Sequence, residues 1–452
     1  MELLACSRCS ASKTALLVSD RWSNIPGQEW IFAVPIEYRQ HGGLHHDRKR
    51  EINPARRRMT LPYNPVYATP PFTDFTSVTP ETPLRSLNLN WREQNLPERE
   101  RTKHVHRLHP YLGKFIPQLT EIFLRKFRPK LVCDPFCGSG TTLVEAAALG
   151  IDSVGCDISE FNCLLTRVKI ARYDIRLLEH EIKDILMKLN LQLRGELFSD
   201  HALHFKTDSE YLKTWFHSKA LQQLLCYRSL IANYQYQDVL KVILSRAARS
   251  SRLTTHYELD WPKKPQTEPY QCFKHSRICQ PTDDALEFLN RYSLDTLKRI
   301  REFNRIRKDV SVHVIFGNAG HIDFPSGIDL VLTSPPYVGI IDYHEQHRYA
   351  YELLGLSWRA EEEIGPAFKG SSKMAQKEYI EQIAAVFDNL RHSLTPDATV
   401  VIIVNDRYRL YDDLPSELGF ALEERLERHV NRRTGMRSND FYESILVWKR
   451  KR

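Results

Sequence analysis

Apolar and polar positions follow two patterns along the chain, one typical of helices and one typical of buried strands. Apolar residues recur at helical spacing over Ile116–Phe127, and a short apolar run at Leu131–Cys133 is typical of a buried strand. A helix of small residues is predicted at Thr141–Leu149, and a second strand at Ser153–Cys156. Strand, turn, helix and strand in this order form a βαβ unit, so we expect a parallel sheet with helices on both faces.

The same alternation of predicted strands and helices occurs in the C-terminal part of the chain. Further strands are predicted at Val312–Phe316, Asp329–Thr333, Thr399–Asn405 and Tyr442–Trp448, with a helix at Tyr379–Ser393. Between the two α/β parts, helical patterns cover Asn162–Ala248 and Asp284–Arg307, on either side of the irregular segment Arg249–Thr282. The pattern therefore predicts an α/β sheet interrupted by a largely helical insertion.

The expected domain organisation follows from these patterns. Residues 1–58 show no clear periodicity, and we interpret them as an arm or as translated sequence upstream of a start at Met59. Residues 59–101 form a Pro-rich extended segment, residues 102–175 and 308–452 the α/β domain, and residues 176–307 the helical insertion.

Composition excludes several classes of protein. The 452 residues are 42% hydrophobic, enough for a large core, and no apolar stretch approaches the roughly 20 residues of a membrane span. Nine irregularly spaced cysteines do not form a disulfide framework and fit a reducing cytoplasm. We expect no metal site, because the pair Cys6 and Cys9 lacks a second ligand pair and His45 and His46 are poor candidates.

A glycine-rich turn follows the first expected strand, with the sequence DPFCGSGTT over residues 134–142. Its glycines allow a ligand to approach the backbone, and the next strand ends at Asp157, where a carboxylate can bind ribose hydroxyls. Leu143 replaces the third glycine of a dinucleotide loop, and the Gly-Lys-Ser/Thr of a phosphate loop is absent. Because Asp134 suits a cation better than a diphosphate, the turn favours S-adenosylmethionine.

A second motif, Ser334-Pro335-Pro336-Tyr337, ends the strand at Asp329–Thr333. The prolines form a rigid platform at the carboxyl edge of the sheet, where open α/β folds bind their ligands. The Ser334 hydroxyl and the Pro335 carbonyl can accept the hydrogens of an exocyclic amine, and Tyr337 can stack on the base that carries it. A base flipped out of a nucleic acid fits this arrangement.

Together, DPFCGSGTT and TSPPY resemble the amino-group DNA methyltransferases of restriction–modification systems, and the Ser-Pro-Pro-Tyr form is typical of N4-cytosine enzymes. The segment His109–Phe115 and the sequence Ile340–Tyr343 are also similar to the family. The resemblance implies a Rossmann-like methyltransferase fold with a seven-stranded mixed sheet. It implies that the catalytic residues are Ser334, Pro335, Pro336 and Tyr337, and that S-adenosylmethionine contacts Lys114, Asp134, Phe136, Gly138, Ser139, Gly140, Thr141, Asp157, Ile158 and Asn318.

Charge suggests where DNA binds. Part of the net charge of +8 lies in residues 241–280. This segment contains eight Lys and Arg residues and only three acidic residues, with aromatic residues between them. Because basic side chains neutralise phosphates, we expect phosphate contacts there. The expected contact residues are Arg249, Arg252, Lys263, Lys264, Lys274 and Arg277. An alternative source of specificity is residues 338–377, whose histidines His344 and His347 we expect to be solvated or to cap helices.

The sequence therefore predicts a site-specific enzyme that methylates N4 of a flipped-out cytosine in double-stranded DNA, with residues 176–307 as the target-recognition region. Three alternatives stay open: an N6-adenine DNA enzyme, an RNA base N-methyltransferase and a non-catalytic DNA-binding relative. The family also implies a cognate restriction endonuclease and a prokaryotic, nucleoid-associated setting. No membrane partner is expected.

Overall fold

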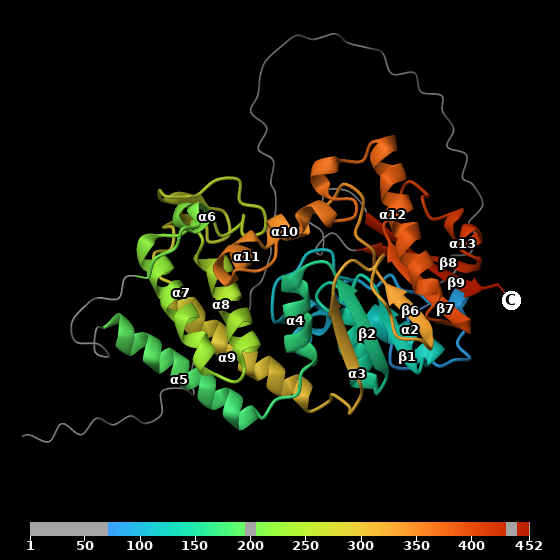
Figure 1. Cartoon of the computed structure of the whole chain (residues 1–452), viewed down its shortest axis with the longest axis horizontal. Coiled ribbons are helices and arrows are strands. Elements are labelled where there is room, and N and C mark those ends of the chain that lie inside the picture. The colour runs from blue at the N-terminus through green and yellow to red at the C-terminus, as the bar shows by residue number, and fades with distance from the viewer. Residues whose placement is uncertain (1–70, 195–204, 431–440, 452) are drawn as a thin grey trace, which may run out of the picture. The chain divides into compact units, whose positions relative to one another are not determined.

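A seven-stranded mixed sheet forms the centre of the computed structural model, which describes residues 71–194, 205–430 and 441–451 (Figure 1). The expectations for residues 1–58, and for the start at Met59, lie outside the described residues. The strand order is β5-β2-β1-β6-β7-β9-β8. Five strands are parallel: β1 (Leu131–Asp134), β2 (Asp152–Asp157), β5 (Val312–Phe316), β6 (Ile328–Thr333) and β7 (Leu394–Val404).

The last two strands run against the others. β9 (Phe441–Arg450) is inserted between β7 and β8 (Phe420–Val430) and is antiparallel to both. The predicted α/β fold with a seven-stranded mixed sheet is confirmed, and the observed strand order is that of a Rossmann-like methyltransferase sheet. The sequence analysis did not predict β8.

Alternating side chains of the strands face two separate helical layers, as expected for buried strands. Val401 and Ile403 pack with α2 (Pro117–Phe127), whereas Val400 and Ile402 pack with α12 (Lys373–Arg391) on the opposite face. α3 (Thr141–Leu149) follows the glycine-rich turn, and α4 (Glu160–Ile170) follows β2. Both helices begin at the carboxyl edge of the sheet, and this edge therefore carries the motifs.

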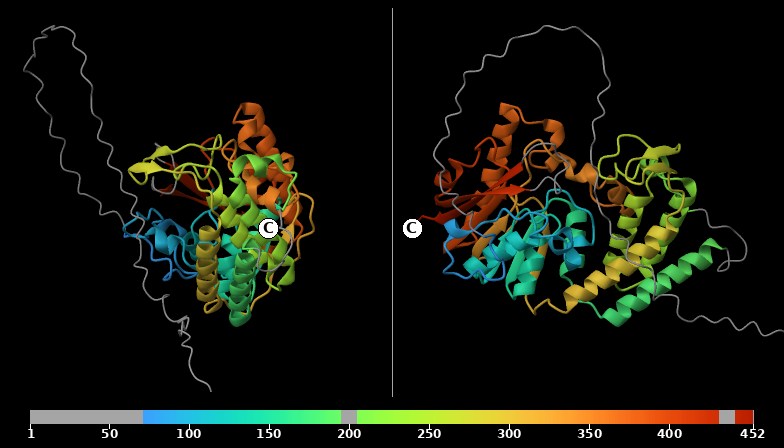
Figure 2. Two further views of the ribbon diagram at one scale, coloured as in Figure 1. Left: turned by 90° about the vertical axis from the view of Figure 1, so that its left-hand side faces the viewer. Right: turned by 180° about the vertical axis from the view of Figure 1, so that it is seen from behind.

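The insertion is helical, and its apolar core is continuous with that of α3 and α4. Its long helices are α5 (Ile175–Leu193), α7 (Ser218–Leu230), α8 (Gln237–Ser251) and α9 (Leu286–Asn304), and a short helix, α6 (Glu210–Trp215), precedes α7. A small hairpin of β3 (Tyr270–Cys272) and β4 (Arg277–Cys279) lies between α8 and α9. Figure 2 shows this yellow-green hairpin projecting from the helices. Among the described helices, none is long and apolar enough to cross a membrane.

Residues 71–101 are packed against the sheet rather than merely extended. Leu89 and Trp91 are buried in the same apolar cluster as α2. The Asn90 side-chain oxygen accepts the backbone N–H of His429 on β8 at 2.6 Å. This segment therefore covers part of the antiparallel end of the sheet, together with a short helix, α1 (Glu98–Arg101).

Candidate active site

An open cavity of about 840 Å³ lies at the carboxyl ends of β1, β2 and β6. Most of the predicted site residues line it: Lys114, Phe136, Gly138, Ser139, Thr141, Asp157, Ile158, Asn318, Ser334 and Pro336. The glycine-rich turn and the Ser-Pro-Pro-Tyr motif thus meet in one pocket, although 196 residues separate Gly138 from Ser334 in the sequence.

Four predicted residues do not line the pocket: Asp134, Gly140, Pro335 and Tyr337. Gly140 is at φ 80°, and an added Cβ would lie 2.6 Å from Thr166 Cγ2, so this position of the turn requires glycine. Asp134 is buried behind the turn, where one carboxylate oxygen accepts the Thr333 hydroxyl at 2.6 Å. These two residues therefore shape the turn from behind.

Asp157 fastens the glycine-rich turn to the end of β2. Its carboxylate accepts the backbone N–H groups of Gly138 and Ser159, both at 2.8 Å, and the Asn162 amide at 3.0 Å. Burial raises the pKa of Asp157, and these hydrogen bonds oppose the rise. The carboxylate lines the pocket while it also fixes the position of the turn.

Two side chains of α4 fix the carbonyl groups of the turn, and the sequence analysis missed both. Thr166 donates to the Gly138 carbonyl at 3.0 Å, and the buried Lys169 donates to the Ser139 carbonyl at 2.5 Å. Burial lowers the pKa of Lys169 well below its usual value. Their spacing of three residues on a helix was the available signal, because such residues share one face.

Two ionisable groups of this region, Lys114 and Asp134, have pKa values near neutrality. Burial lowers the pKa of Lys114 to about 8, and its ammonium donates to the His106 carbonyl at 2.8 Å. Burial also raises the pKa of Asp134 to about 6, although hydrogen bonds from Thr333 and the Phe136 N–H oppose this rise. The second carboxylate oxygen of Asp134 is buried without a hydrogen-bond partner among the described residues.

The Ser-Pro-Pro-Tyr turn is held by side chains from α12 and β9. The Tyr379 hydroxyl donates to the Pro336 carbonyl at 3.0 Å. The Tyr337 hydroxyl lies 3.4 Å from a carboxylate oxygen of Glu443, and its ring lies 6.2 Å from that of Phe441. Burial raises the pKa of Tyr337 well above its usual value, so this side chain stays a neutral phenol.

Three polar atoms of pocket residues are buried without a hydrogen-bond partner in the described part of the chain: Ser139 Oγ, Asn162 Oδ1 and Ser334 Oγ. Buried polar atoms normally have partners, so these atoms suit a polar ligand. Gly138 is part of the same wall, and a Cβ there would lie 3.0 Å from the Tyr111 hydroxyl. The residues present therefore fit S-adenosylmethionine, whose adenosine and methionine parts carry several hydrogen-bonding groups.

The expectation that His344 and His347 are solvated is wrong. Both are buried, and His344 Nδ1 lies 2.5 Å from Glu363, which also accepts the backbone N–H groups of Tyr343 and His344. Glu363 and Tyr343 line the pocket. His344 lies in a short helix, α10 (Tyr343–Gln346), and His347 is at the N-cap position of α11 (Arg348–Leu354), although its side chain makes no capping hydrogen bond. α11 shares its apolar core with the insertion.

The predicted DNA-contact residues separate into two groups. Lys263, Lys264, Lys274 and Arg277 are exposed. In contrast, Arg249 pairs with Asp260, and the buried Arg252 donates to the Leu259 carbonyl at 2.5 Å. The guanidinium of Arg252 also lies 4.5 Å from the Tyr349 ring centre. The expected phosphate contacts of Arg249 and Arg252 are therefore corrected, because both side chains are engaged inside the fold.

Further pocket residues were not among the predicted contacts: Tyr111, Gly113, Phe115, Pro135, Cys137, Ser159, Asn162, Gly317, Ala319, Tyr343, Glu362, Glu363, Ile364 and Val386. Several of them lie in the segments that are similar to the family, His109–Phe115 and Ile340–Tyr343. This similarity could have identified them as pocket residues. Glu362 ends a short 3-10 helix (Ala360–Glu362), Glu363 and Ile364 follow it, and this segment has no motif.

Comparison with known proteins gives one extended similarity and several weaker ones. A family described as DNA methylase matches residues 88–167. Type II methyltransferase M.MjaII of Methanocaldococcus jannaschii is 38% identical over 433 residues, covering 78% of this chain and 82% of that protein. Type II methyltransferase M.BsoBI of Geobacillus stearothermophilus is 22% identical, covering 72% and 66%.

Two methyltransferases that are named for RNA substrates also match this chain. The tRNA (guanine(10)-N2)-dimethyltransferase of M. jannaschii is 31% identical over 107 residues, covering 20% of this chain and 29% of that enzyme. The rRNA methyltransferase AviRa from Streptomyces viridochromogenes has a TM-score of 0.29 and 13% identity, covering 75% of this chain and 88% of that one.

Proposed function

Because this chain belongs to the amino-group DNA methyltransferases of restriction–modification type, which use S-adenosylmethionine, we propose that it methylates N4 of a cytosine flipped out of double-stranded DNA. The observation that carries this proposal is the buried Ser334 hydroxyl oxygen in the pocket that also contains the glycine-rich turn. The proposed setting is the cytoplasm, beside chromosomal DNA and a cognate endonuclease.

The cofactor-binding half of the pocket is proposed to consist of the glycine-rich turn, Asp157, Ile158 and Asn318. When bound, S-adenosylmethionine supplies a methyl group activated by a sulfonium. The negative charges of Asp134 and Asp157 favour such a cation, whereas a diphosphate would be repelled. The Asn318 side-chain oxygen accepts the Gly320 N–H at 2.9 Å, which fixes the loop at the adenine side.

The catalytic half is proposed to act on the target amine. An exocyclic amine is a weak nucleophile because its lone pair is conjugated into the ring. The Ser334 hydroxyl and the Pro335 carbonyl would accept its two hydrogens and so favour a pyramidal nitrogen with an available lone pair. Tyr337, a neutral phenol held beside Glu443 and Phe441, would stack on the base. The proton of the methylated amine would leave to solvent, so no strong base is needed.

Recognition of DNA is assigned to the insertion and its hairpin. Lys263, Lys264, Lys274 and Arg277 are exposed, as are the aromatic side chains of Trp261 and Phe273. Cations with interleaved aromatic groups suit a backbone of phosphates and an opened base stack. Arg249 and Arg252 would position this region rather than contact DNA.

The test is incubation of the full chain with tritiated S-adenosylmethionine and either mixed genomic DNA or total RNA, followed by digestion to nucleosides. Label in N4-methylcytosine from DNA supports the proposal. Label in N6-methyladenine retains the DNA enzyme and rejects the cytosine assignment, and label in RNA alone rejects DNA as the substrate. A Ser334→Ala variant, which removes one amine acceptor, is the matched control for contaminating activity.

A further inference from the structure

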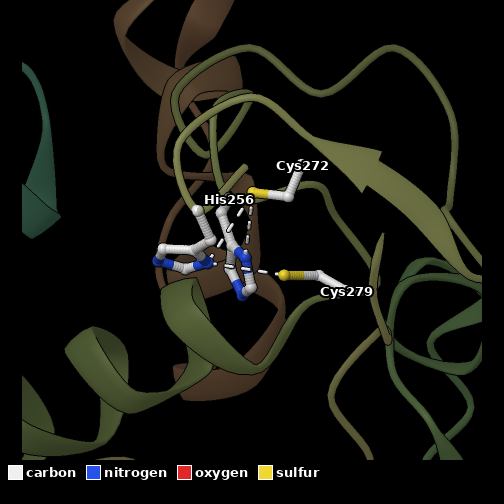
Figure 3. A group of neighbouring side chains, drawn as sticks. His256, Cys272 and Cys279 are labelled. Carbon is white, nitrogen blue, oxygen red and sulfur yellow. Dashed lines mark hydrogen bonds between the residues drawn. The ribbon is translucent and has the colours of Figure 1, made fainter. Parts of the chain in front are cut away.

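Four side chains that offer metal ligands converge beside the hairpin of the insertion. His256 lies in the loop after α8, Cys272 ends β3, His275 lies in the turn, and Cys279 ends β4. Figure 3 shows the labelled side chains of His256, Cys272 and Cys279 pointing toward one another. One ligand atom from each of the four residues lies within 4.8 Å of the others.

The separations between these atoms fit a tetrahedral metal site. Cys272 Sγ is 3.6 Å from His256 Nδ1 and 3.7 Å from His275 Nδ1, and His275 Nδ1 is 3.4 Å from Cys279 Sγ. A tetrahedral zinc ion with Zn–S bonds of about 2.3 Å and Zn–N bonds of about 2.05 Å gives nitrogen–sulfur edges of about 3.6 Å.

Hydrogen bonds among these side chains are a weaker explanation of the cluster. His275 Nδ1 faces two sulfur atoms, yet a neutral imidazole nitrogen carries either one proton or one lone pair. It cannot form a full hydrogen bond with both thiols. A central ion that binds all four atoms accounts for their common direction.

The donor set also selects the metal. Two cysteines and two histidines, with no carboxylate, form the closed set of a structural zinc site. Two thiolates would balance the charge of a divalent ion, which is important because the neighbouring Lys274 and Arg277 are cations. Binding would release the two thiol protons to solvent.

The hairpin has little else to stabilise it. Each strand has three residues, and its buried apolar cluster consists of Tyr270, Cys272 and Cys279. Two-stranded hairpins of this size are marginally stable in water, and small units commonly use a metal instead of a core. A metal would hold the hairpin and thereby present the exposed Phe273 and Ile278, which are 73% and 68% exposed.

A second cluster of potential ligands, His104, His106 and Glu145, provides a contrast. The Glu145 carboxylate already pairs with Lys103 at 2.8 Å and bonds His106 at 2.7 Å. An ammonium group in contact with the carboxylate opposes a bound cation. In the hairpin cluster, by contrast, the side-chain ligand atoms contact one another.

We propose that His256, Cys272, His275 and Cys279 bind one structural Zn²⁺ ion that fixes the β3–β4 hairpin. The expectation of no metal site followed from inspecting Cys6 and Cys9 alone. The four ligands are separated by intervals of 15, two and three residues, and only the fold of the hairpin brings His256 to the others.

The test is the zinc content of the full chain, purified under reducing conditions without added metal or chelator and measured by inductively coupled plasma mass spectrometry. About one zinc per chain is expected in the wild type and in two controls, Cys6→Ser with Cys9→Ser, and Cys226→Ser. Cys272→Ser and Cys279→Ser should each lose at least tenfold. Zinc below 0.1 per chain, zinc retained in both hairpin variants, or a Cys272–Cys279 disulfide would overturn the proposal.

Spectroscopy of the wild type keeps the test independent of whether the variants fold. After removal of zinc, added Co²⁺ should give the intense visible bands of a tetrahedral site with thiolate ligands. A weak octahedral spectrum would overturn the assignment. Neither readout depends on methyl transfer, so failure of the proposed function leaves this result unaffected.

Discussion

The Tyr379 hydroxyl donates a hydrogen bond to the Pro336 carbonyl at 3.0 Å and thereby ties α12 to the Ser-Pro-Pro-Tyr turn. The Tyr411 hydroxyl lies 2.6 Å from the Tyr379 hydroxyl. Because the proton of Tyr379 is directed at Pro336, Tyr411 is the donor in this second bond. All three groups are buried or half-buried, so the proposed catalytic turn is fixed from behind by a chain of hydrogen bonds.

Removal of this bond should slow methyl transfer. In Tyr379→Phe the ring remains and the bond to Pro336 is lost, which is worth about 0.5–1.5 kcal/mol and thus up to about tenfold in kcat. The KM for S-adenosylmethionine should change by less than about twofold. Tyr411→Phe is the matched control, since it retains the Pro336 bond. Equal losses of kcat in both variants would contradict the positioning role.

Two pocket serines should affect different kinetic constants. Ser334→Ala should lower kcat by about 100-fold with little change in cofactor binding, because the proposed contact is made to the reacting amine. Ser139→Ala should instead weaken cofactor binding by about tenfold, since its unpaired hydroxyl lies in the glycine-rich turn. Steady-state kinetics and calorimetry check the pair. An unchanged kcat in Ser334→Ala would reject the catalytic assignment.

Cofactor affinity should fall in weak acid. The folded pKa of Asp134 is raised to about 6, so this carboxyl protonates as the pH falls through 6 and no longer attracts a cation. At pH 5 about one molecule in eleven keeps the charge, which predicts up to a tenfold loss of affinity for S-adenosylmethionine relative to pH 7.5. Calorimetric titrations across this range measure it.

Asp134→Asn is the control for that pH dependence. It should bind more weakly at pH 7.5 and show a flatter profile, with any remaining slope assigned to Asp157, whose pKa burial also raises. Without cofactor, the contribution of Asp134 to the free energy of unfolding has the opposite pH dependence. Because the folded pKa exceeds the unfolded value of 3.8, the contribution of Asp134 declines as the pH rises from about 4 through 6. A wild-type profile shared by Asp134→Asn would contradict this account.

Neutralising the exposed basic residues should reduce the salt dependence of DNA binding. In Lys263→Gln/Lys264→Gln/Arg277→Gln, the slope of log K against log salt should shrink by about 0.9 for each lost phosphate contact. Arg249→Gln is the control, because its guanidinium pairs with Asp260. It should lower the melting temperature and leave the slope unchanged. An unchanged slope in the triple variant would place the DNA elsewhere.

Much of the sheet was predictable because its inner strands are continuous apolar runs. The inner strands predicted at Leu131–Cys133 and Asp329–Thr333 differ from β1 and β6 by one residue each. The edge strand β5 and the helix α3 have the predicted bounds. β8, at the opposite edge from β5, was not predicted because it carries charged residues at Glu423, Glu424 and Arg425. A register shift between Leu422 and Glu424 also breaks its alternation.

Site residues were predictable where they belong to a local sequence motif. They were not predictable where the direction of a side chain in the folded protein determines its role. Gly138 and Ser334 belong to motifs that fix their place at strand ends. Counting basic residues could not show that Arg252 points inward, because its burial depends on the Tyr349 ring, which comes from a distant helix, and on the local Leu259 carbonyl. Likewise, Tyr379 reads as an ordinary apolar position of a helix until the fold brings Pro336 to it.

The identity of the methylated atom tests the central claim most directly. Duplex DNA treated with the wild type and S-adenosylmethionine carrying a trideuterated methyl group should yield deuterated N4-methylcytosine on nucleoside mass spectrometry. The yield should fall about 100-fold with Ser334→Ala. Deuterium in N6-methyladenine, with or without dependence on Ser334, would contradict the account.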